Sequence, residues 1–515
     1  MNGAEALIKT LSDGGVEVCF ANPGTSEMQL VAAIGRHNSM RAILGLFEGV
    51  VTGAADGYGR MAGKPAATLL HLGPGLANGL ANLHNAKRAR TPLINIVGDH
   101  AVDHLQLDAP LTSDIVGVAT PMSDWVRTST SPSDLSIAGA ESIAVSQQYP
   151  GKIATIIAPG DHTWTDGAEV SPPGIVSDAP RVSDSEIAQA AALMSRSGPG
   201  ALFIGGMALR EDALFHAGRI VAATGARIIT DTSPARLQRG AGRVVVERIP
   251  YFAEQAVEFL DGVEQIVFVG SKPPVSFFAY PDKPSWLSPE TAELLKLADA
   301  RTDAEDTLRR LADALNAPAE PANVQPTRDA TYDEGKLDAK SAGIITAQLL
   351  PENAIVSDEG VSSGGPFYKY TSGAAKHDWM CITGGAIGQG LPLATGAAVA
   401  CPDRKVIALE ADGSGMYTIQ ALWTMARENL DVTTIILKNN SYGILNIELD
   451  RVGVANPGPK TLSMLDLSNP ILDWVSMSEG MGVPATRAET TQQFHDALSD
   501  ALAQKGPRLI EAVLT

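Results

Sequence analysis

The sequence predicts an α/β protein made of three domains, each built on a doubly wound parallel sheet. Short apolar runs alternate with helix-like segments throughout the chain, and this rhythm is typical of parallel sheets covered by helices. The chain has 515 residues, which is enough for two or three domains with separate cores. Stretches rich in Pro, Ser and Asp separate the domains that we expect at 1–165, 186–316 and 336–515.

In the first domain, residues 4–11 predict an amphipathic helix and residues 17–20 predict a strand that ends at an Asn-Pro-Gly-Thr turn. Residues 48–60 predict a helix lined by small side chains on one face. Three further buried strands are expected at 44–47, 66–70 and 91–97.

The second domain is expected to have strands at 201–204, 226–229 and 265–269. Gly205 and Gly206 follow the first of these strands, but the GxGxxG fingerprint with a downstream acid is absent. We therefore expect neither NAD nor FAD in this domain.

The third domain is expected to have strands at 406–410, 433–437 and 508–513. Between the first two, apolar residues recur at helical spacing from 419 to 426. This order of strand, helix and parallel strand brings the carboxyl ends of the two strands to one edge of the sheet, where open α/β sheets bind ligands.

The composition excludes several classes of partner. A formal net charge of −19 argues against nucleic acid and anionic membranes as partners. Cys19, Cys381 and Cys401 lack metal-ligand spacing. No signal-peptide pattern or membrane-spanning apolar run is present, so we expect a soluble cytoplasmic protein.

Oxygen-bearing residues follow both strands of the third domain's central unit. Asp412, Gly413 and Ser414 follow the first strand, and Asn439 and Ser441 follow the second. A carboxylate, an amide oxygen and a turn carbonyl suit Mg²⁺ or Ca²⁺, and N–H groups at the start of a helix favour an anion. The pattern indicates a metal–diphosphate site, although two ordinary turns would give the same residues.

This segment, from Asp412-Gly413-Ser414 to Asn439-Asn440, resembles the thiamine-diphosphate binding motif, with Ala411 in place of its first glycine. The chain is similar over its whole length to the thiamine-diphosphate-dependent decarboxylase and acetolactate synthase family, most of all to the benzoylformate decarboxylase branch. The resemblance implies pyrimidine-binding, middle and diphosphate-binding domains, in that order. It also implies Asp412, Asn439 and the Ser441 carbonyl as metal ligands, with Gly413, Ser414 and Tyr442 at the cofactor.

Glu48 lies in the segment FEGVVTGAADGYGR, which also resembles the family. The resemblance implies that Glu48 bonds the aminopyrimidine ring of the cofactor, which supplies a carbanion nucleophile. On the sequence alone, Glu48 is equally well a helix-start residue stabilised by the helix dipole. The family also implies that Ile387 bends the cofactor, that the Gly385 carbonyl accepts its amino group, and that Ser362 lies near its diphosphate.

Two further residues are candidates for contact with substrate. His71 matches a proton-transfer histidine of the family, and near-neutral titration suits that role. Thr25 matches a serine that contacts the substrate carboxylate. A structural histidine and a plain turn are the competing interpretations. The family's second active-site histidine would fall within 276–280, where there is none, and His100 or His104 is a candidate replacement.

The family resemblance implies an enzyme that decarboxylates a 2-oxo acid without oxidation and releases an aldehyde. The close alternative is an acetolactate-synthase-like carboligase, which joins the same intermediate to a second 2-oxo acid or aldehyde. A catalytically silent homologue is a further alternative, and a nucleotide-dependent oxidoreductase lacks its fingerprint. Family architecture implies a homodimer or homotetramer with sites at the subunit interface.

Overall fold

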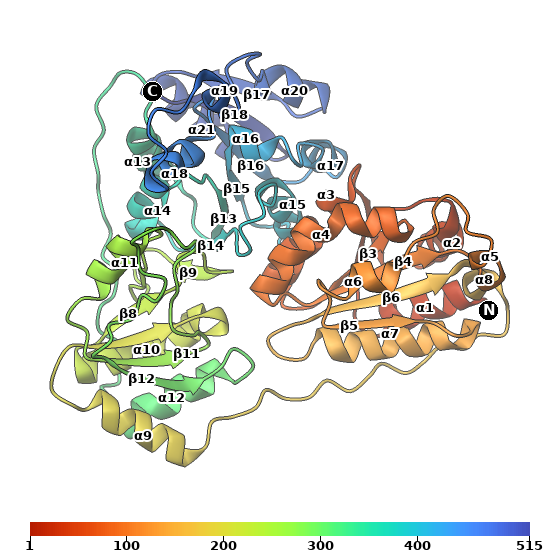
Figure 1. The fold of residues 1–515 in the computed structure, drawn as a ribbon, viewed down its shortest axis with the longest axis horizontal. Coiled ribbons are helices and arrows are strands. Elements are labelled where there is room, and N and C mark those ends of the chain that lie inside the picture. Colours follow the sequence, from red (N-terminus) through yellow and green to blue (C-terminus); the bar gives the residue numbers. More distant parts are fainter.

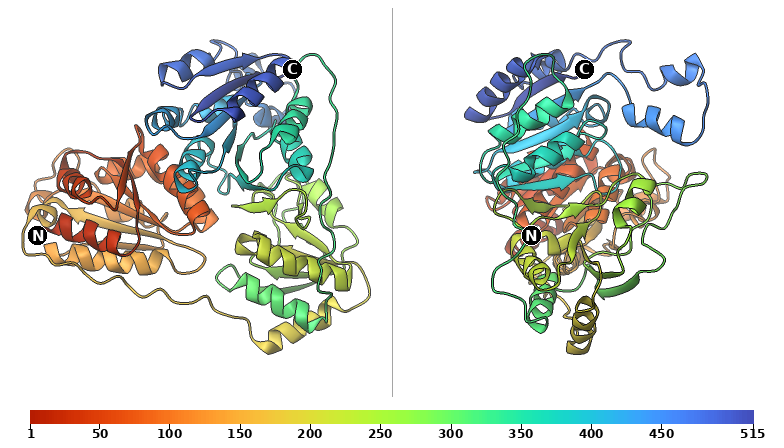
Figure 2. Two further views of the ribbon diagram at one scale, coloured as in Figure 1. Left: turned by 180° about the vertical axis from the view of Figure 1, so that it is seen from behind. Right: turned by 90° about the vertical axis from the view of Figure 1, so that its left-hand side faces the viewer.

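Three parallel β-sheets organise the chain, as the sequence predicts, and the computed structural model describes all 515 residues. Figure 1 shows the first domain in red and orange, the second in yellow and green and the third in blue. Residues 167–183, between the first two domains, and residues 315–338, between the last two, contain no helix or strand. Both segments run along the outside of the molecule (Figures 1 and 2).

The first sheet has the strand order β2-β1-β3-β4-β6-β5 and is parallel throughout. Helices α1, α2, α7 and α8 cover one face, and α3, α4 and α6 cover the other. The strands are β1 (Val18–Asn22), β2 (Arg41–Leu44), β3 (Ala66–Leu70), β4 (Leu93–Asp99), β5 (Trp125–Thr128) and β6 (Ile153–Pro159). The helices are α1 (Gly3–Asp13), η1 (Thr25–Glu27), α2 (Met28–Arg36), α3 (Glu48–Ala62), α4 (Leu72–Ala89), α5 (Val102–Leu105), α6 (Ile115–Ala119), α7 (Pro132–Ser146) and α8 (Gly160–Trp164).

The second sheet has the order β10-β8-β7-β11-β12. Helices α9, α10 and α12 pack on one face and α11 packs on the other. The elements are α9 (Asp184–Met194), β7 (Gly200–Ile204), η2 (Gly206–Leu209), α10 (Glu211–Thr224), β8 (Arg227–Thr230), β10 (Glu247–Arg248), α11 (Ala253–Leu260), β11 (Gln265–Val269), β12 (Glu293–Ala298) and α12 (Ala304–Ala314).

The third sheet has the order β17-β18-β16-β15-β13-β14-β9. Its last strand, β9 (Leu237–Arg239), comes from the second domain's part of the chain and pairs antiparallel with β14. The other strands are β13 (Ala354–Glu359), β14 (His377–Cys381), β15 (Val406–Ala411), β16 (Val432–Lys438), β17 (Ala485–Ala488) and β18 (Arg508–Val513). The helices are α13 (Ala339–Leu349), α14 (Gly365–Tyr370), η3 (Thr371–Gly373), α15 (Gly390–Ala400), α16 (Asp412–Gly415), α17 (Ala421–Arg427), α18 (Gly443–Arg451), α19 (Pro459–Ser463), α20 (Trp474–Gly480) and α21 (Thr491–Ala503).

Two sequence-based expectations about elements were wrong. The strand expected at 44–47 is β2, which ends at Leu44, because the chain must turn there to begin α3 at Glu48. The helix expected to open at Gly413 is only the single turn α16, and the longer helix α17 begins at Ala421.

The first and third domains share one hydrophobic core, which runs through the contact between α3 and α15. A Cβ atom on Gly57 would lie 2.0 Å from the Leu393 carbonyl oxygen, and one on Gly396 would lie 1.8 Å from the Ala54 carbonyl oxygen. The two helices therefore meet backbone to backbone, and only glycine fits at either crossing point.

A buried ion pair joins all three domains beside this contact. Arg60 donates two hydrogen bonds to the Asp56 carboxylate, through Nε (2.8 Å) and Nη2 (2.6 Å). Its Nη1 donates to the carbonyl oxygens of Ala235 (3.1 Å) and Cys381 (2.8 Å), in the second and third domains. Such bidentate pairing offsets much of the cost of burying the charges.

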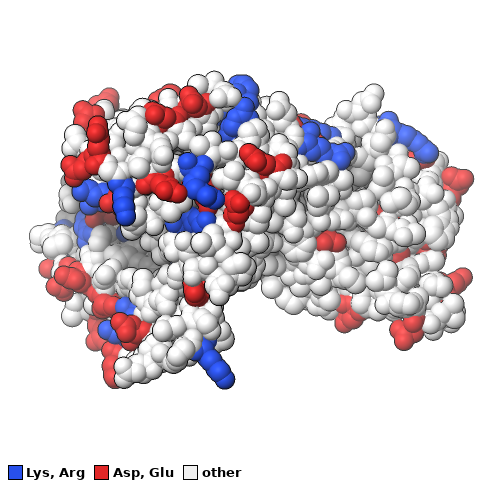
Figure 3. All heavy atoms as spheres, turned by 90° about the horizontal axis from the view of Figure 1, so that it is seen from above, with Lys and Arg blue, Asp and Glu red and all other residues white.

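Acidic and basic side chains are interspersed on the face shown in Figure 3, and that face carries no continuous basic surface of the kind that nucleic acids require. No helix is both long and apolar enough to cross a bilayer.

We predict that Gly57→Ala destabilises the protein by about 3 kcal/mol, because the new methyl group forces α3 and α15 apart. Gly35→Ala is the matched control, since Gly35 is also helical but has no atom within 4 Å of its Cβ position. That change should be neutral or stabilising by up to about 1 kcal/mol. Thermal unfolding of the two variants checks the prediction, and equal midpoints would contradict it.

Candidate active site

The carboxyl ends of β15 and β16 meet at Asp412, as the sequence predicts. The Asp412 carboxylate accepts hydrogen bonds from the backbone amides of Gly413 (2.9 Å), Asn439 (3.2 Å) and Asn440 (2.7 Å). It is almost completely buried, and burial raises its pKa while these amides lower it. Asp412 thus ties together the two loops that the sequence assigns to the metal.

The Asn439 side chain is positioned within the same cluster. Its Oδ1 accepts a hydrogen bond from the amide of Ser441 (3.0 Å), while the Ser441 hydroxyl donates to the Leu465 carbonyl (3.2 Å). Asn440 adopts φ +54°, a left-handed turn that asparagine tolerates. The turn leaves Asp412, Asn439 and Ser441 next to one another.

The remaining residues predicted on this side also lie in the cluster. A Cβ on Gly413 would lie 2.5 Å from the Tyr442 ring, and a Cβ on Gly443 would lie 3.2 Å from the Ser362 hydroxyl. The Ser414 hydroxyl is buried with no hydrogen-bond partner. These observations describe a cradle lined by glycine backbone and hydroxyl groups.

The donor set restricts what this cradle can hold. Nowhere does the structure bring together three or more His, Cys, Asp or Glu residues suited to a metal. Asp412 supplies the one carboxylate here, and its oxygens keep free lone pairs beyond the bonds they accept. A site with one carboxylate and neutral oxygens suits Mg²⁺ only if phosphate oxygens complete its coordination. The residues therefore fit a metal together with a diphosphate group.

A glycine-rich turn, residues 384–390, lies between β14 and α15. Gly385 and Gly388 have φ of +74° and +93°, a region that favours glycine. The Asn85 side chain, from α4, holds the start of the turn by accepting from Gly384 N (3.1 Å) and donating to Ala386 O (2.8 Å). Ile387 is half-buried within the turn.

Glu48 begins α3 and is half-buried. Its carboxylate accepts a hydrogen bond from the Asn78 side chain (3.0 Å). A Cβ on Gly75 would lie 3.2 Å from Glu48 Oε1 and 3.3 Å from His71 Cβ. The structure therefore brings Glu48 and His71 together around Gly75, whereas the hydrogen bonds of Glu48 do not reach the Asp412 cluster.

His71 is held by a buried carboxylate that the sequence analysis missed. His71 Nδ1 lies 2.8 Å from Glu27 Oε2, and Glu27 also accepts from Gly24 N (2.7 Å) and from the Ser26 hydroxyl (2.8 Å). Because an ionised carboxylate only accepts hydrogen bonds, Nδ1 donates and Nε2 remains free. The available sequence signal was an acid directly after the Asn-Pro-Gly-Thr turn.

The other first-domain candidates lie near this pair without bonding to it. Thr25 is exposed at the start of η1, beside Gly24, over which the His71 ring packs. His100 and His104 stack with ring centroids 5.3 Å apart. They follow β4 at the same edge of the sheet, but neither makes a hydrogen bond to His71 or Glu48.

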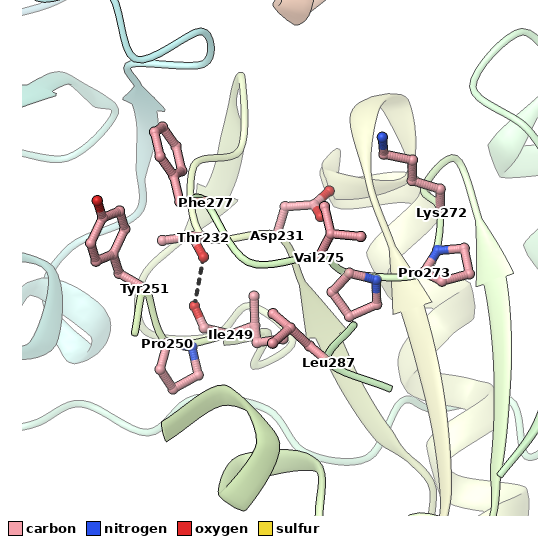
Figure 4. A pocket seen from close by; sticks show the side chains of 11 residues that line it. Asp231, Thr232, Ile249, Pro250, Tyr251, Lys272, Pro273, Val275, Phe277 and Leu287 are labelled. Atoms are coloured by element: carbon pink, nitrogen blue, oxygen red, sulfur yellow. Dashed lines mark hydrogen bonds between the residues drawn. The ribbon is translucent and has the colours of Figure 1, made fainter. Parts of the chain in front are cut away.

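The segment 276–280, where the family places its second histidine, borders the glycine-rich turn. The Phe277 ring lies 2.9 Å from the Cβ position of Gly385 and stacks against Tyr251 and Phe278. Figure 4 shows Phe277 at the rim of a cavity of about 110 Å³, and the Asp231 carboxylate lies in the same lining. An aromatic ring thus takes the place of a titratable group.

Two family descriptions match this chain. "Thiamine pyrophosphate enzyme, N-terminal TPP binding domain" matches residues 1–118, and "Thiamine pyrophosphate enzyme, C-terminal TPP binding domain" matches residues 365–512. The first match contains Glu27, Glu48 and His71, and the second contains the Asp412 cradle.

Individual relatives are similar over the whole length. IlvX of Mycobacterium tuberculosis, which is named provisionally as an acetolactate synthase large subunit, is 52% identical over 515 residues, covering 100% of this chain and 99% of its own. The benzoylformate decarboxylase of Pseudomonas aeruginosa is 29% identical, covering 98% and 97%. The thiamine diphosphate-dependent 4-hydroxybenzoylformate decarboxylase of Rhodococcus jostii has a TM-score of 0.88 at 25% identity, covering 100% and 99%.

We predict that Glu27→Ala destabilises the protein by about 3 kcal/mol, because it leaves buried donors at Gly24 and Ser26 without their acceptor. Asp13→Ala is the control, since Asp13 is exposed and its ion pair with Lys9 lies on the surface, where such pairs contribute little. Thermal unfolding should show a clear loss for the first variant and almost none for the second. An unchanged midpoint for Glu27→Ala would contradict this account of the pair.

Proposed function

The chain belongs to the thiamine pyrophosphate enzyme family, and on that premise we propose that it decarboxylates a 2-oxo acid without oxidation and releases an aldehyde, with thiamine diphosphate and Mg²⁺ as cofactors. The single observation that carries the proposal is the Glu27–His71 pair beside Glu48. It gives the site one group able to hold a proton near neutral pH.

The third-domain cradle supports the cofactor assignment. Asp412, Asn439 and the Ser441 carbonyl would hold Mg²⁺, and the unpartnered Ser414 hydroxyl with Ser362 would contact the diphosphate. Tyr442, packed over Gly413, would close one side. Bound thiamine diphosphate supplies a carbon nucleophile and an electron sink for decarboxylation.

The remaining proposed contacts concern the cofactor ring. Glu48 would exchange a proton with the pyrimidine, since its carboxylate is bonded only by Asn78. The Gly385 carbonyl and the Ile387 side chain belong to a turn whose shape two positive-φ glycines set. These roles remain proposals that rest on the family pattern and on the proximity described above.

His71 would deliver the proton that releases the aldehyde. With Nδ1 fixed on Glu27, the ring is oriented and Nε2 is left to exchange a proton. Thr25, exposed beside Gly24, would contact the substrate carboxylate. Phe277 and its aromatic neighbours border the turn, which supports an apolar side chain on the 2-oxo acid because aromatic walls favour apolar groups.

An acetolactate-synthase-like carboligation is the second candidate function. The 52% identity to a relative named provisionally as an acetolactate synthase large subunit favours it specifically. Both reactions share every step up to loss of CO₂, so the residues above serve either. They differ in whether a proton or a second 2-oxo acid or aldehyde meets the bound product.

We also propose that the active unit is at least a homodimer, with Glu48 of one subunit facing Asp412 of another. Large apolar side chains are exposed beside both halves of the site, at Leu46 next to Glu48 and at Met416 and Tyr417 next to Ser414. Exposed apolar surface of this kind is typical of an interface. The expected location is the cytoplasm, with no nucleic acid or membrane partner.

The first test offers the purified protein, with thiamine diphosphate and Mg²⁺, a panel of aliphatic and aromatic 2-oxo acids. We expect aldehyde as the main product, detected by a coupled dehydrogenase and by chromatography. His71→Phe should lower aldehyde formation about 100-fold, the usual contribution of a positioned proton donor. Acetohydroxy acid as the main wild-type product would favour the second candidate, and no product from any 2-oxo acid would contradict both.

The second test concerns Glu48. Glu48→Gln should still bind thiamine diphosphate but lose hydrogen–deuterium exchange at the cofactor C2 atom, because the amide cannot exchange a proton with the ring. Calorimetry measures the binding, and quenched-flow NMR measures the exchange. Asn78→Ala, which removes only the hydrogen bond to Glu48, serves as the control and should retain most of the exchange. A wild-type rate in Glu48→Gln would remove this residue from the mechanism.

A further inference from the structure

Two buried acids lie side by side beneath the glycine-rich turn. Glu359 ends β13, Glu410 lies in β15, and the two residues are register partners in the parallel sheet. Their exposures are 1% and 0%. Burial raises the pKa of Glu359 to about 7, and burial together with Glu359 raises the pKa of Glu410 well above its usual value. Burying acids is costly unless they serve a purpose, and neither was identified from the sequence.

Only Glu359 bonds to the turn. Its Oε1 accepts from the amide of Gly388 (2.7 Å), and its Oε2 accepts from the amide of Gly390. Glu410 packs against the same backbone, since a Cβ on Gly390 would lie 2.3 Å from its Oε2, but neither of its oxygens has a hydrogen-bond partner. The two acids therefore share an environment and differ in what they hold.

The bonds from Glu359 fall where the backbone needs an acceptor. Gly390 begins α15, and the first amides of a helix have no partner within it. A carboxylate at this end also interacts favourably with the helix dipole. Glu359 thus caps α15 from a strand that lies some distance earlier in the chain, in place of a local capping side chain, which α15 lacks.

This cap fixes one end of the turn, and Asn85 fixes the other. Ile387 lies between the two anchors, immediately before Gly388, whose φ of +93° would otherwise allow the backbone to change conformation. We infer that Glu359 is a positioning residue, which holds the 384–390 turn in the shape that thiamine diphosphate requires. The inference rests on the proposed function, because it takes the turn to face that cofactor.

Glu359→Gln is the decisive variant. A carboxylate accepts both amides at once, whereas a carboxamide offers one acceptor oxygen and turns its NH₂ group toward the other donor. Glu410→Gln is the matched control, because it makes the same isosteric change in the neighbouring buried acid, which bonds no amide of the turn.

Hydrogen–deuterium exchange on the coenzyme-free proteins, read by mass spectrometry on the peptide covering 384–391, gives the first measurement. Glu359→Gln should exchange about tenfold faster there than wild type, as expected when a bond to a charged acceptor is lost, with the remaining third-domain peptides unchanged. Glu410→Gln should exchange at the wild-type rate. Calorimetry with thiamine diphosphate and Mg²⁺ should then show about tenfold weaker binding for Glu359→Gln alone.

Equal exchange in Glu359→Gln and wild type, or the same increase in both variants, would overturn the inference. If Glu359→Gln does not fold, the wild-type protein decides, because fast exchange of its own 384–391 peptide would show that no anchor exists. If wild-type protein takes up no thiamine diphosphate while the exchange pattern holds, the proposed function fails but the anchoring by Glu359 stands.

Discussion

The close contact between α3 and α15 is the constraint on which the rest of the structure depends. Gly57 and Gly396 let the two backbones touch, and each helix begins at a part of the proposed site. Glu48 opens α3, and the glycine-rich turn leads into α15. Because a packed interior does not deform continuously, this one crossing sets where the first-domain and third-domain residues lie relative to one another. The Asp56–Arg60 pair fastens the second domain to the same point.

A second feature recurs around the site. Three turns are each held by a buried carboxylate that accepts backbone amides: Glu27 holds the turn at Gly24, Asp412 holds the loop at Asn439 and Asn440, and Glu359 holds the turn at Gly388. Hydrogen bonds to a charged acceptor are stronger than those between neutral groups, so such anchors fix irregular backbone that helices and strands cannot reach. Loops that must present their backbone to a ligand gain rigidity in this way.

The parts of this arrangement that the sequence predicted are local. Strands β3, β11 and β18 were predicted with their observed bounds, because their apolar runs are short and sharply ended. Asp412 and Asn439 were found because each follows such a strand. Glu27 and Glu359 were missed because their partners lie at His71 and Gly388, and a bond between distant segments leaves no periodic signal in the chain. The same reason hides β9, which crosses into another domain's sheet.

The anchoring by Asp412 also determines how an anion must be held. The sequence suggested that the amides after β15 would bind phosphate directly, but the Gly413 amide is already donated to Asp412, as are those of Asn439 and Asn440. With a net charge of −19, the chain offers no long-range attraction to a diphosphate. What remains beside Asp412 is oxygen in hydroxyl, amide and carbonyl groups, most of it better suited to a cation than to an anion. Affinity for the diphosphate must therefore come chiefly through a divalent metal, and binding without one should be weak.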